Sequence, residues 1–230
     1  MAMTTTGPRT GSSVPRLVGN RWALVGAVVY LCEWVAIIAV ALGGASDFIL
    51  RGASSDALVE TYTGRADSLS FLAGWFAVVL LGRVLFFAAV RRSLADSGLP
   101  HVLLDLAVVA SAVSVTLEVV SYAFVIPAAE AADQGERTLV EFFDLAGAGL
   151  NLMIGGGLGV AIVCTAYVMA DSGYFNRWLN GLGIVSGVAI VGAQLSVSPS
   201  LSGLFDVLYF FPLVFWVWMI WTSVVLWRRA

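Results

Sequence analysis

Residues 22–42 read WALVGAVVYLCEWVAIIAVAL, a run of about twenty mostly apolar residues that contains one charged side chain, Glu33. At a rise of about 1.5 Å per residue, a helix of this length spans roughly the 30 Å hydrocarbon core of a bilayer. An ordinary soluble domain rarely buries so long an apolar helix on every side. The run therefore predicts a membrane-spanning helix and indicates the fold class.

The rest of the chain repeats this pattern. Of its 230 residues, 60% are hydrophobic and 12% are charged, and the mean hydropathy is +0.92. Gly, Ser and Pro residues typical of loops separate six apolar segments, at about 22–43, 69–90, 102–126, 142–169, 178–197 and 204–227. We therefore expect an all-α fold, an integral membrane bundle of six transmembrane helices. Residues 21–230 would form this single domain after a disordered cytoplasmic tail, residues 1–20.

The arginines indicate how the bundle is oriented. Eight of them lie in the N-terminal tail, the second and fourth loops and the C-terminus, whereas three lie in the first and third loops. Short loops rich in arginine tend to stay in the cytoplasm. We therefore expect a multi-pass protein of the bacterial cytoplasmic (inner) membrane with both the N- and C-termini cytoplasmic. The long connection over residues 45–68 would then lie outside, as a lid or a short surface helix.

The composition argues against several classes of protein. A net charge of −3 leaves no basic face for nucleic acid. Cys32 and Cys164 both lie in apolar segments, which does not suggest a disulfide framework. The single histidine, His101, precedes the third apolar segment. We therefore expect it to be a solvated residue at the membrane interface rather than a metal ligand. We expect no cofactor and no metal, and the partners predicted are membrane lipid and a lipophilic small-molecule substrate. The oligomeric state stays open.

Two pairs of glycines predict close contacts between helices. Gly155 and Gly159 lie four residues apart in the fourth apolar segment, and Gly183 and Gly187 have the same spacing in the fifth. Small residues at this spacing allow the backbones of membrane helices to approach each other closely. We therefore expect a structural role for these glycines.

Ionisable side chains inside apolar segments are costly and normally face the interior of a bundle. Seven occur here: Glu33, Arg83, Asp105, Glu118, Glu141, Asp144 and Asp206. Arg83 lies seven residues before the end of the second segment and Asp105 three residues after the start of the third. Both would then lie near the cytoplasmic side, so we expect them to pair, with Arg91, Arg92 or lipid phosphate as further partners.

The acids of the outer half have no obvious basic partner at their depth. Glu33 lies near the middle of the first segment and Glu118 sixteen residues into the third. We predict that these two are catalytic residues at the floor of a polar pocket that opens outward, because a buried neutral carboxyl group is a proton donor. The other residues predicted to line this pocket are Tyr30, Trp34, Tyr122, Asp144, Asn151, Gln194 and Asp206.

Structural roles for the same residues stay open. Glu141, Asp144 and Asp206 lie near predicted helix N-termini, where acids cap free N–H groups and complement the helix dipole. Glu33 and Glu118 would instead form hydrogen bonds between helices. The Trp and Tyr rings either face lipid or line the pocket, where their π faces can stabilise a cation.

Two resemblances bear on the fold. Residues 171–187, DSGYFNRWLNGLGIVSG, resemble the segment that links helices 4 and 5 in a set of uncharacterised bacterial six-helix membrane proteins, and residues 216–229 are similar too. This resemblance covers the C-terminal third and implies the six-helix fold without an activity. In size, helix content and intramembrane acids the chain is also similar to small membrane-integral bacterial terpene cyclases, which protonate a prenyl chain or its epoxide. No specific motif of theirs matches, and no residue role is carried over.

Three functions follow from these observations. The first is a membrane-embedded cyclase, an isomerase or lyase of isoprenoid biosynthesis, in which Glu33 or Glu118 protonates a lipophilic prenylated substrate while aromatic rings shelter the carbocation. Because no aspartate-rich diphosphate motif is present, protonation rather than ionisation would start the reaction. The second is a proton-coupled carrier of a small molecule or cation. The third is a non-catalytic membrane protein that binds lipid or a partner.

Overall fold

The computed structural model describes residues 17–42, 54–196, 200, 202–208 and 211–230, with the backbone alone for 40–42, 202 and 205–206. These residues are all-helical and contain no β-strand, which confirms the predicted all-α class for the described part of the chain. The helices are α1 (Arg21–Leu31), α2 (Glu33–Leu42), α3 (Ser55–Tyr62), α4 (Ala66–Val79), α5 (Leu81–Asp96), α6 (Val102–Ala123), α7 (Val125–Asp133), α8 (Arg137–Leu152), α9 (Ile154–Ser172), α10 (Arg177–Leu195), α11 (Ser202–Leu208) and α12 (Phe211–Trp227).

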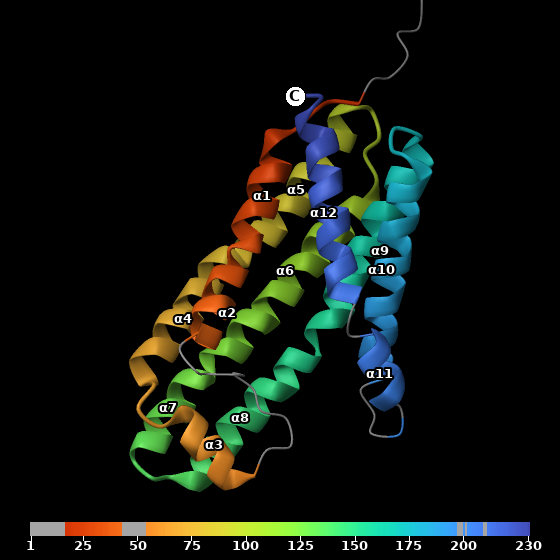
Figure 1. The fold of residues 1–230 in the computed structure, drawn as a ribbon. Coiled ribbons are helices and arrows are strands. Elements are labelled where there is room, and N and C mark those ends of the chain that lie inside the picture. The colour runs from red at the N-terminus through yellow and green to blue at the C-terminus, as the bar shows by residue number, and fades with distance from the viewer. Residues whose placement is uncertain (1–16, 43–53, 197–199, 201, 209–210) are drawn as a thin grey trace, which may run out of the picture.

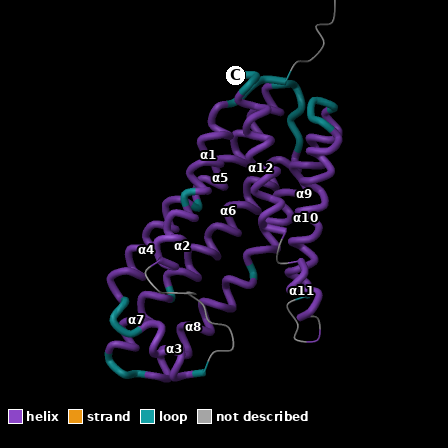
Figure 2. Tube along the Cα trace, viewed as in Figure 1, coloured by secondary structure: helices purple, strands orange, loops and turns teal. Residues whose placement is uncertain are grey.

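Several of these helices follow one another end to end and form long rods that run side by side (Figures 1 and 2). Five segments are long and apolar enough to cross a membrane: Arg21–Ala39, Ala66–Asp96, Val102–Asp133, Arg137–Ser172 and Arg177–Leu195. Helix α12 is apolar as well but has only 17 described residues. The structure is therefore compatible with a multi-pass membrane protein.

Four rods are interrupted at a single residue, namely Cys32, Leu80, Phe124 and Met153. At each of these breaks a backbone N–H bonds to the carbonyl three residues earlier instead of four, as in the bonds from Val35 N to the Cys32 carbonyl (3.2 Å) and from Arg83 N to the Leu80 carbonyl (3.1 Å). Pro127 accounts for the break at Phe124, because proline cannot donate to the carbonyl four residues earlier. The other breaks occur without a proline.

Glycines allow two pairs of helices to pack with their backbones nearly in contact. A Cβ atom added at Gly159 of α9 would lie 2.8 Å from the carbonyl oxygen of Gly187 on α10, as the glycine spacing predicted. A second such contact, between α1 and α5, was not predicted. A Cβ atom at Gly82 would lie only 2.5 Å from the carbonyl oxygen of Gly26. These contacts fix the distances between the rods that surround the interior.

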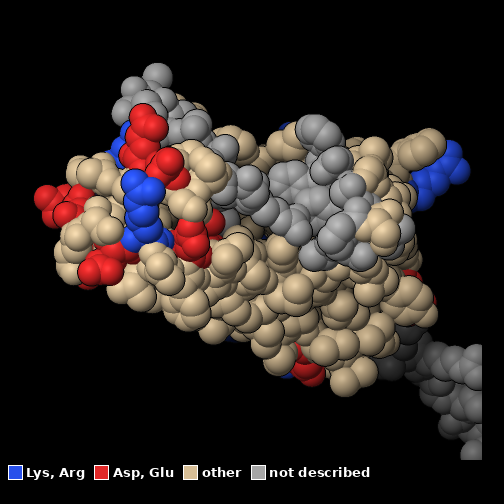
Figure 3. All heavy atoms as spheres, turned by 90° about the horizontal axis from the view of Figure 1, so that it is seen from below, with Lys and Arg blue, Asp and Glu red and all other residues tan. Residues whose placement is uncertain are grey.

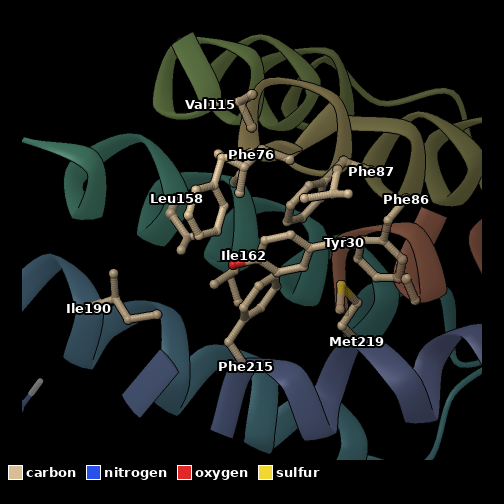
Figure 4. Close-up of a cluster of buried hydrophobic side chains, with 14 of the residues drawn as sticks. Tyr30, Phe76, Phe86, Phe87, Val115, Leu158, Ile162, Ile190, Phe215 and Met219 are labelled. Carbon is tan, nitrogen blue, oxygen red and sulfur yellow. The ribbon is translucent and has the colours of Figure 1, made fainter. Parts of the chain in front are cut away.

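A cluster of buried rings joins α1, α5 and α12 (Figure 4). Phe87 and Phe215 stack with their ring centroids 6.4 Å apart and nearly parallel planes. Tyr30 packs against Phe215 at 6.1 Å, and Phe86 lies edge-on to Trp218 at 5.6 Å. Tyr30 is therefore held between the aromatic core on one side and the polar interior described below on the other.

Charged side chains gather at one end of the bundle. At one end, α3 packs on α7 and α8, and charged side chains gather there while most of the remaining described surface in view is uncharged (Figure 3). An ion pair of 2.6 Å joins Asp56 of α3 to Arg137 of α8. The predicted surface helix within residues 45–68 is thus present as α3, whereas residues 45–53 lie outside the described part.

Candidate functional site

Most of the predicted site residues line one cavity of about 430 Å³, to which α1, α2, α5, α6 and α8 to α12 contribute side chains. The predicted residues that line it are Tyr30, Glu33, Trp34, Glu118, Tyr122, Asn151 and Gln194. Arg83 and Trp216 line it as well, together with apolar side chains such as Leu158 and Ile190. These seven predicted residues therefore lie around one cavity.

A buried ion pair forms one wall of this cavity. Arg83 Nη2 donates to Glu118 Oε2 at 2.6 Å and to Ser114 Oγ at 3.2 Å, while Nη1 donates to the Tyr30 hydroxyl at 3.4 Å. Only 1% of the Arg83 side chain is exposed. The guanidinium group also lies over the Tyr30 ring, 5.3 Å from its centroid. Ser114 Oγ in turn donates to the Ile154 carbonyl, so the pair connects α5, α6 and α9.

Two expectations about these charges were wrong. Arg83 does not pair with Asp105, which instead accepts a hydrogen bond from Arg91 Nε. Glu118 is not without a basic partner, since Arg83 reaches it. The reason is that α5 continues through Arg91 to Asp96, so Arg83 lies thirteen residues from the end of its helix rather than seven. Arg83 therefore lies at the depth of Glu118.

The two candidate acids consequently differ in their chemistry. Glu118 forms an ion pair with Arg83, a side chain that is always charged. Glu33 has no such contact among the described residues: its Oε1 atom is buried and has no hydrogen-bond partner there. Its side chain lies within electrostatic range of Glu118, Arg83 and Tyr30. Among the described residues, Glu33 thus lacks the ion pair that Glu118 has.

The position of Glu33 depends on the helix break that precedes it. The break at Cys32 leaves a carbonyl group without its usual helical donor, and the Trp75 indole N–H of α4 donates to this oxygen at 2.9 Å. Glu33 is the first residue of α2 and is only 5% exposed. Trp34 follows it and packs edge-on against Trp216 of α12, with ring centroids 4.8 Å apart. Aromatic rings thus flank the acid.

Amide and aromatic side chains complete the wall. Gln194 Oε1 accepts a hydrogen bond from Gly156 N at 3.2 Å, and Asn151 Nδ2 donates to Ser121 Oγ at 3.4 Å. Tyr122 stacks on Phe76, with ring centroids 4.2 Å apart and planes 12° from parallel. The lining thus combines a few polar groups with a larger apolar surface, as in sites that bind small organic molecules.

One predicted pocket residue, Asp144, lies elsewhere, and a second, Asp206, cannot be placed. Asp144 is buried but does not line the cavity; its Oδ1 accepts a hydrogen bond of 2.8 Å from the Tyr62 hydroxyl, which joins α8 to α3. Nor does Asp144 cap its helix, because α8 begins at Arg137, seven residues earlier. Burial, and next the hydrogen bond to Asp144, raise the pKa of Tyr62 well above its usual value. Asp206 belongs to α11, but its side chain lies outside the described residues.

Sequence reasoning missed Arg83 as a pocket residue and left Trp216 undecided between lipid and pocket. A signal for Arg83 was present, because it is the one arginine inside an apolar segment and therefore needs a buried partner. Comparison of the chain with protein-family models, curated proteins and solved structures gives no significant match. Function is therefore inferred from the residues of the cavity, and both resemblances stay predictions.

Proposed function

We propose that the chain is a six-span membrane protein of the bacterial cytoplasmic membrane, with α12 as the sixth span and both termini cytoplasmic. The 17 residues of α12 extend about 25 Å, close to the thickness of the hydrocarbon layer. Its outward side chains include Val217 and Ile220, which suit contact with lipid. The arginine distribution supports the orientation.

Within this bundle, we propose that the cavity binds a lipophilic small molecule. Its volume of about 430 Å³ falls in the range of roughly 300–1,000 Å³ that is typical of small-molecule sites. The charges of Arg83 and Glu118 balance each other, so a neutral guest needs no additional counter-ion. The rings of Trp34, Tyr122 and Trp216 offer apolar contact and negative π faces.

The reaction that we propose is the acid-initiated cyclisation of a prenylated substrate. The carboxyl proton of Glu33 adds to one carbon of a C=C bond, which leaves a carbocation on the other carbon and a carboxylate at Glu33. A second C=C bond attacks the cation and closes a ring. The cyclised cation then loses a proton to the Glu33 carboxylate, and the product is a cyclic isomer of the substrate. Nearby aromatic rings favour the cation electrostatically.

The observation that carries this proposal is the contrast between Glu33 and Glu118 in one aromatic cavity. Glu118 is neutralised by Arg83, whereas Glu33 is also buried and has an oxygen without a hydrogen bond among the described residues. General acid catalysis needs a carboxyl group that keeps its proton at neutral pH, and exclusion from water favours that state.

The test uses membranes that contain the full chain and a prenylated indole as probe. We expect wild-type membranes to form a cyclic isomer and Glu33→Gln to lose at least about 100-fold of this activity, the usual scale for a general acid. Asp144→Asn is the matched control, because Asp144 is also a buried acid but does not line the cavity. Equal turnover by wild type and Glu33→Gln would contradict the proposal, as would equal losses in both variants.

One observation favours a proton-coupled carrier as the second candidate. The helix breaks at Cys32, Leu80 and Met153 lie within a few residues of cavity-lining side chains, and interrupted helices around a central site are typical of membrane carriers. In proteoliposomes with an imposed pH gradient, a carrier would accumulate a labelled lipophilic amine, and Glu33→Gln would abolish this uptake. Binding of a lipophilic probe with neither turnover nor uptake would leave the non-catalytic function.

A further inference from the structure

Tyr30 and Glu33 lie three residues apart, at the end of α1 and the start of α2, and both line the cavity. Residues at this spacing share a helix face, and Cys32 between them keeps helical backbone angles, with φ −65° and ψ −8°. The Tyr30 ring is buried, packed against Phe215 (Figure 4) and covered by the Arg83 guanidinium group. Its hydroxyl group is therefore held in one place on the cavity wall.

The neighbours of this hydroxyl group determine where its proton points. A hydroxyl oxygen has two lone pairs that accept hydrogen bonds and one proton that it donates. Arg83 Nη1 donates to the Tyr30 oxygen at 3.4 Å, and the Trp216 indole N–H, which has no other partner among the described residues, is its second hydrogen-bonding neighbour. Arginine and tryptophan side chains can only donate. Together they occupy the accepting side of the oxygen and leave its proton for a third group.

The third group is the Glu33 side chain, which forms a hydrogen bond with Tyr30. Glu118, the other acid near Tyr30, is already bonded to Arg83 at 2.6 Å. Because the Tyr30 hydroxyl accepts from its other neighbours, it is the donor in its bond to Glu33. A hydrogen bond to a carboxylate is roughly twice as strong as one between neutral groups. Tyr30 therefore binds the ionised form of Glu33 more strongly than the protonated form.

We propose that Tyr30 is a positioning residue for Glu33: its O–H group holds the Glu33 carboxyl group and stabilises the carboxylate that remains after proton transfer. The donors Arg83 and Trp216 direct that O–H group. This inference rests on the proposed function, in which Glu33 is the acid. Tyr30 keeps its own proton throughout, so only the Glu33 proton passes to the substrate and is later recovered. Because the link is an uncharged hydroxyl group, it joins the acid to Arg83 without adding a charge to the site.

Infrared difference spectra of the full chain in lipid nanodiscs test this bond without a substrate. A carboxylic acid C=O stretch that is present in wild type and absent in Glu33→Gln belongs to the protonated Glu33 group. Such a stretch moves to higher frequency when a hydrogen bond to the carboxyl group is lost, so we expect this band to rise in Tyr30→Phe. Tyr122→Phe is the matched control, because Tyr122 also lines the cavity but is not among the side chains that act on Glu33. In this variant the band should stay at the wild-type frequency.

Turnover of the prenylated indole gives a second measurement. A group that stabilises the carboxylate acts after the substrate has bound, and Tyr30→Phe keeps the ring that lines the cavity. We therefore expect Tyr30→Phe to lower kcat about tenfold, the worth of a hydrogen bond to a charged group, while KM stays within about twofold of wild type. A variant that only folds less well would lower the yield of active protein but leave the infrared band unmoved.

An unmoved band in Tyr30→Phe would overturn the inference, as would a raised KM with unchanged kcat. An equal shift in Tyr30→Phe and Tyr122→Phe would also overturn it, because the cavity as a whole would then have changed. An acid band missing from wild type would remove Glu33 as the acid, and with it the proposed function. The inference would then require that the carboxylate stretch absent from Glu33→Gln shifts in Tyr30→Phe alone. A band that shifts as expected without any turnover would remove only the cyclase.

Discussion

Helices α5 and α6 are joined by two ion pairs of the same chemistry in contrasting surroundings. Arg91 and Asp105 meet with about half of each side chain exposed, 48% and 54%. Arg83 and Glu118 meet with 1% and 12% exposed. An exposed pair is screened by water and salt and contributes little to stability, whereas a buried pair cannot lose one partner without leaving an isolated charge. Burial, rather than residue type, therefore determines how strongly the protein depends on each pair.

This contrast bears on the role of the buried pair. Apolar residues of similar volume often stabilise a protein as well as a buried ion pair does, so burial alone is weak evidence that such a pair exists for stability. Arg83 and Glu118 line the cavity and set its charge, whereas Arg91 and Asp105 do not line it. We therefore infer that the buried pair serves the site, and that the exposed pair is an ordinary surface contact.

The largest effect is expected from breaking the buried pair. Glu118→Ala leaves the Arg83 guanidinium buried without its counter-charge, and we expect the free energy of unfolding to fall by about 3–5 kcal/mol. Reversible unfolding in mixed detergent micelles, titrated with sodium dodecyl sulfate, measures this change. The double variant Arg83→Met with Glu118→Leu should be more stable than Glu118→Ala, because no isolated charge remains. A double variant less stable than the single one would contradict this account.

The next largest effect concerns the backbone contact that positions the buried pair. Gly82 precedes Arg83 and lets α5 approach α1, which carries Tyr30. Because a Cβ atom there would meet the backbone of both Gly26 and Tyr30 at 2.5 Å, we expect Gly82→Val to lower the free energy of unfolding by about 2–3 kcal/mol. Gly74→Val is the control, since a Cβ atom there meets nothing within 4 Å. Similar losses in both variants would show that the contact is unimportant.

A smaller effect is expected where a buried acid has an uncharged partner. Tyr62→Phe removes the donor to Asp144 but leaves no isolated charge of opposite sign, so we expect a loss of about 1–2 kcal/mol, between those of the two ion pairs. Thermal unfolding in detergent measures it. Tyr167→Phe, the same change at a tyrosine that is 54% exposed, should stay within about 0.5 kcal/mol of wild type. A Tyr62→Phe protein as stable as this control would contradict the prediction.

The smallest effect belongs to the exposed pair. Asp105→Asn removes one charge from a pair that water already screens, and we expect a loss of less than about 1 kcal/mol that disappears at high salt. Unfolding measured at low and high salt tests both parts. A loss as large as that of Glu118→Ala would mean that exposure does not separate the two pairs.

The helices were largely predictable because long apolar runs have few alternatives in a membrane protein. The predicted segments 102–126 and 178–197 begin within one residue of α6 and α10. The predicted second segment ended too early, because its boundary was placed at two charged residues. Arginine side chains can extend their charged groups toward water while their backbone continues the helix, so α5 runs on to Asp96.

The site could be predicted only as far as the depth of each residue along its helix determines which residues meet. Glu33, Glu118, Asn151 and Gln194 lie at similar depth and meet in one cavity. Contacts that depend on which helices are neighbours could not be predicted, because hydropathy says nothing about neighbours. The pairing of Arg83 with Glu118 and the donation from Trp75 to the break at Cys32 belong to this class. Breaks without proline also leave no signature in a hydropathy pattern.

Hydrogen bonds join the start of α1 to α12, a helix that is synthesised much later. The Leu226 carbonyl accepts from Asn20 N at 3.1 Å, and Ser223 Oγ donates to the Ala23 carbonyl across 200 positions of sequence. The ribosome exposes α1 long before α12, so the buried face of α1 must wait in lipid or against an insertion factor for its partner. Trp216, which arrives with α12, completes the cavity wall. A nascent chain therefore contains Glu33 before the α12 residues that complete the cavity wall have been made.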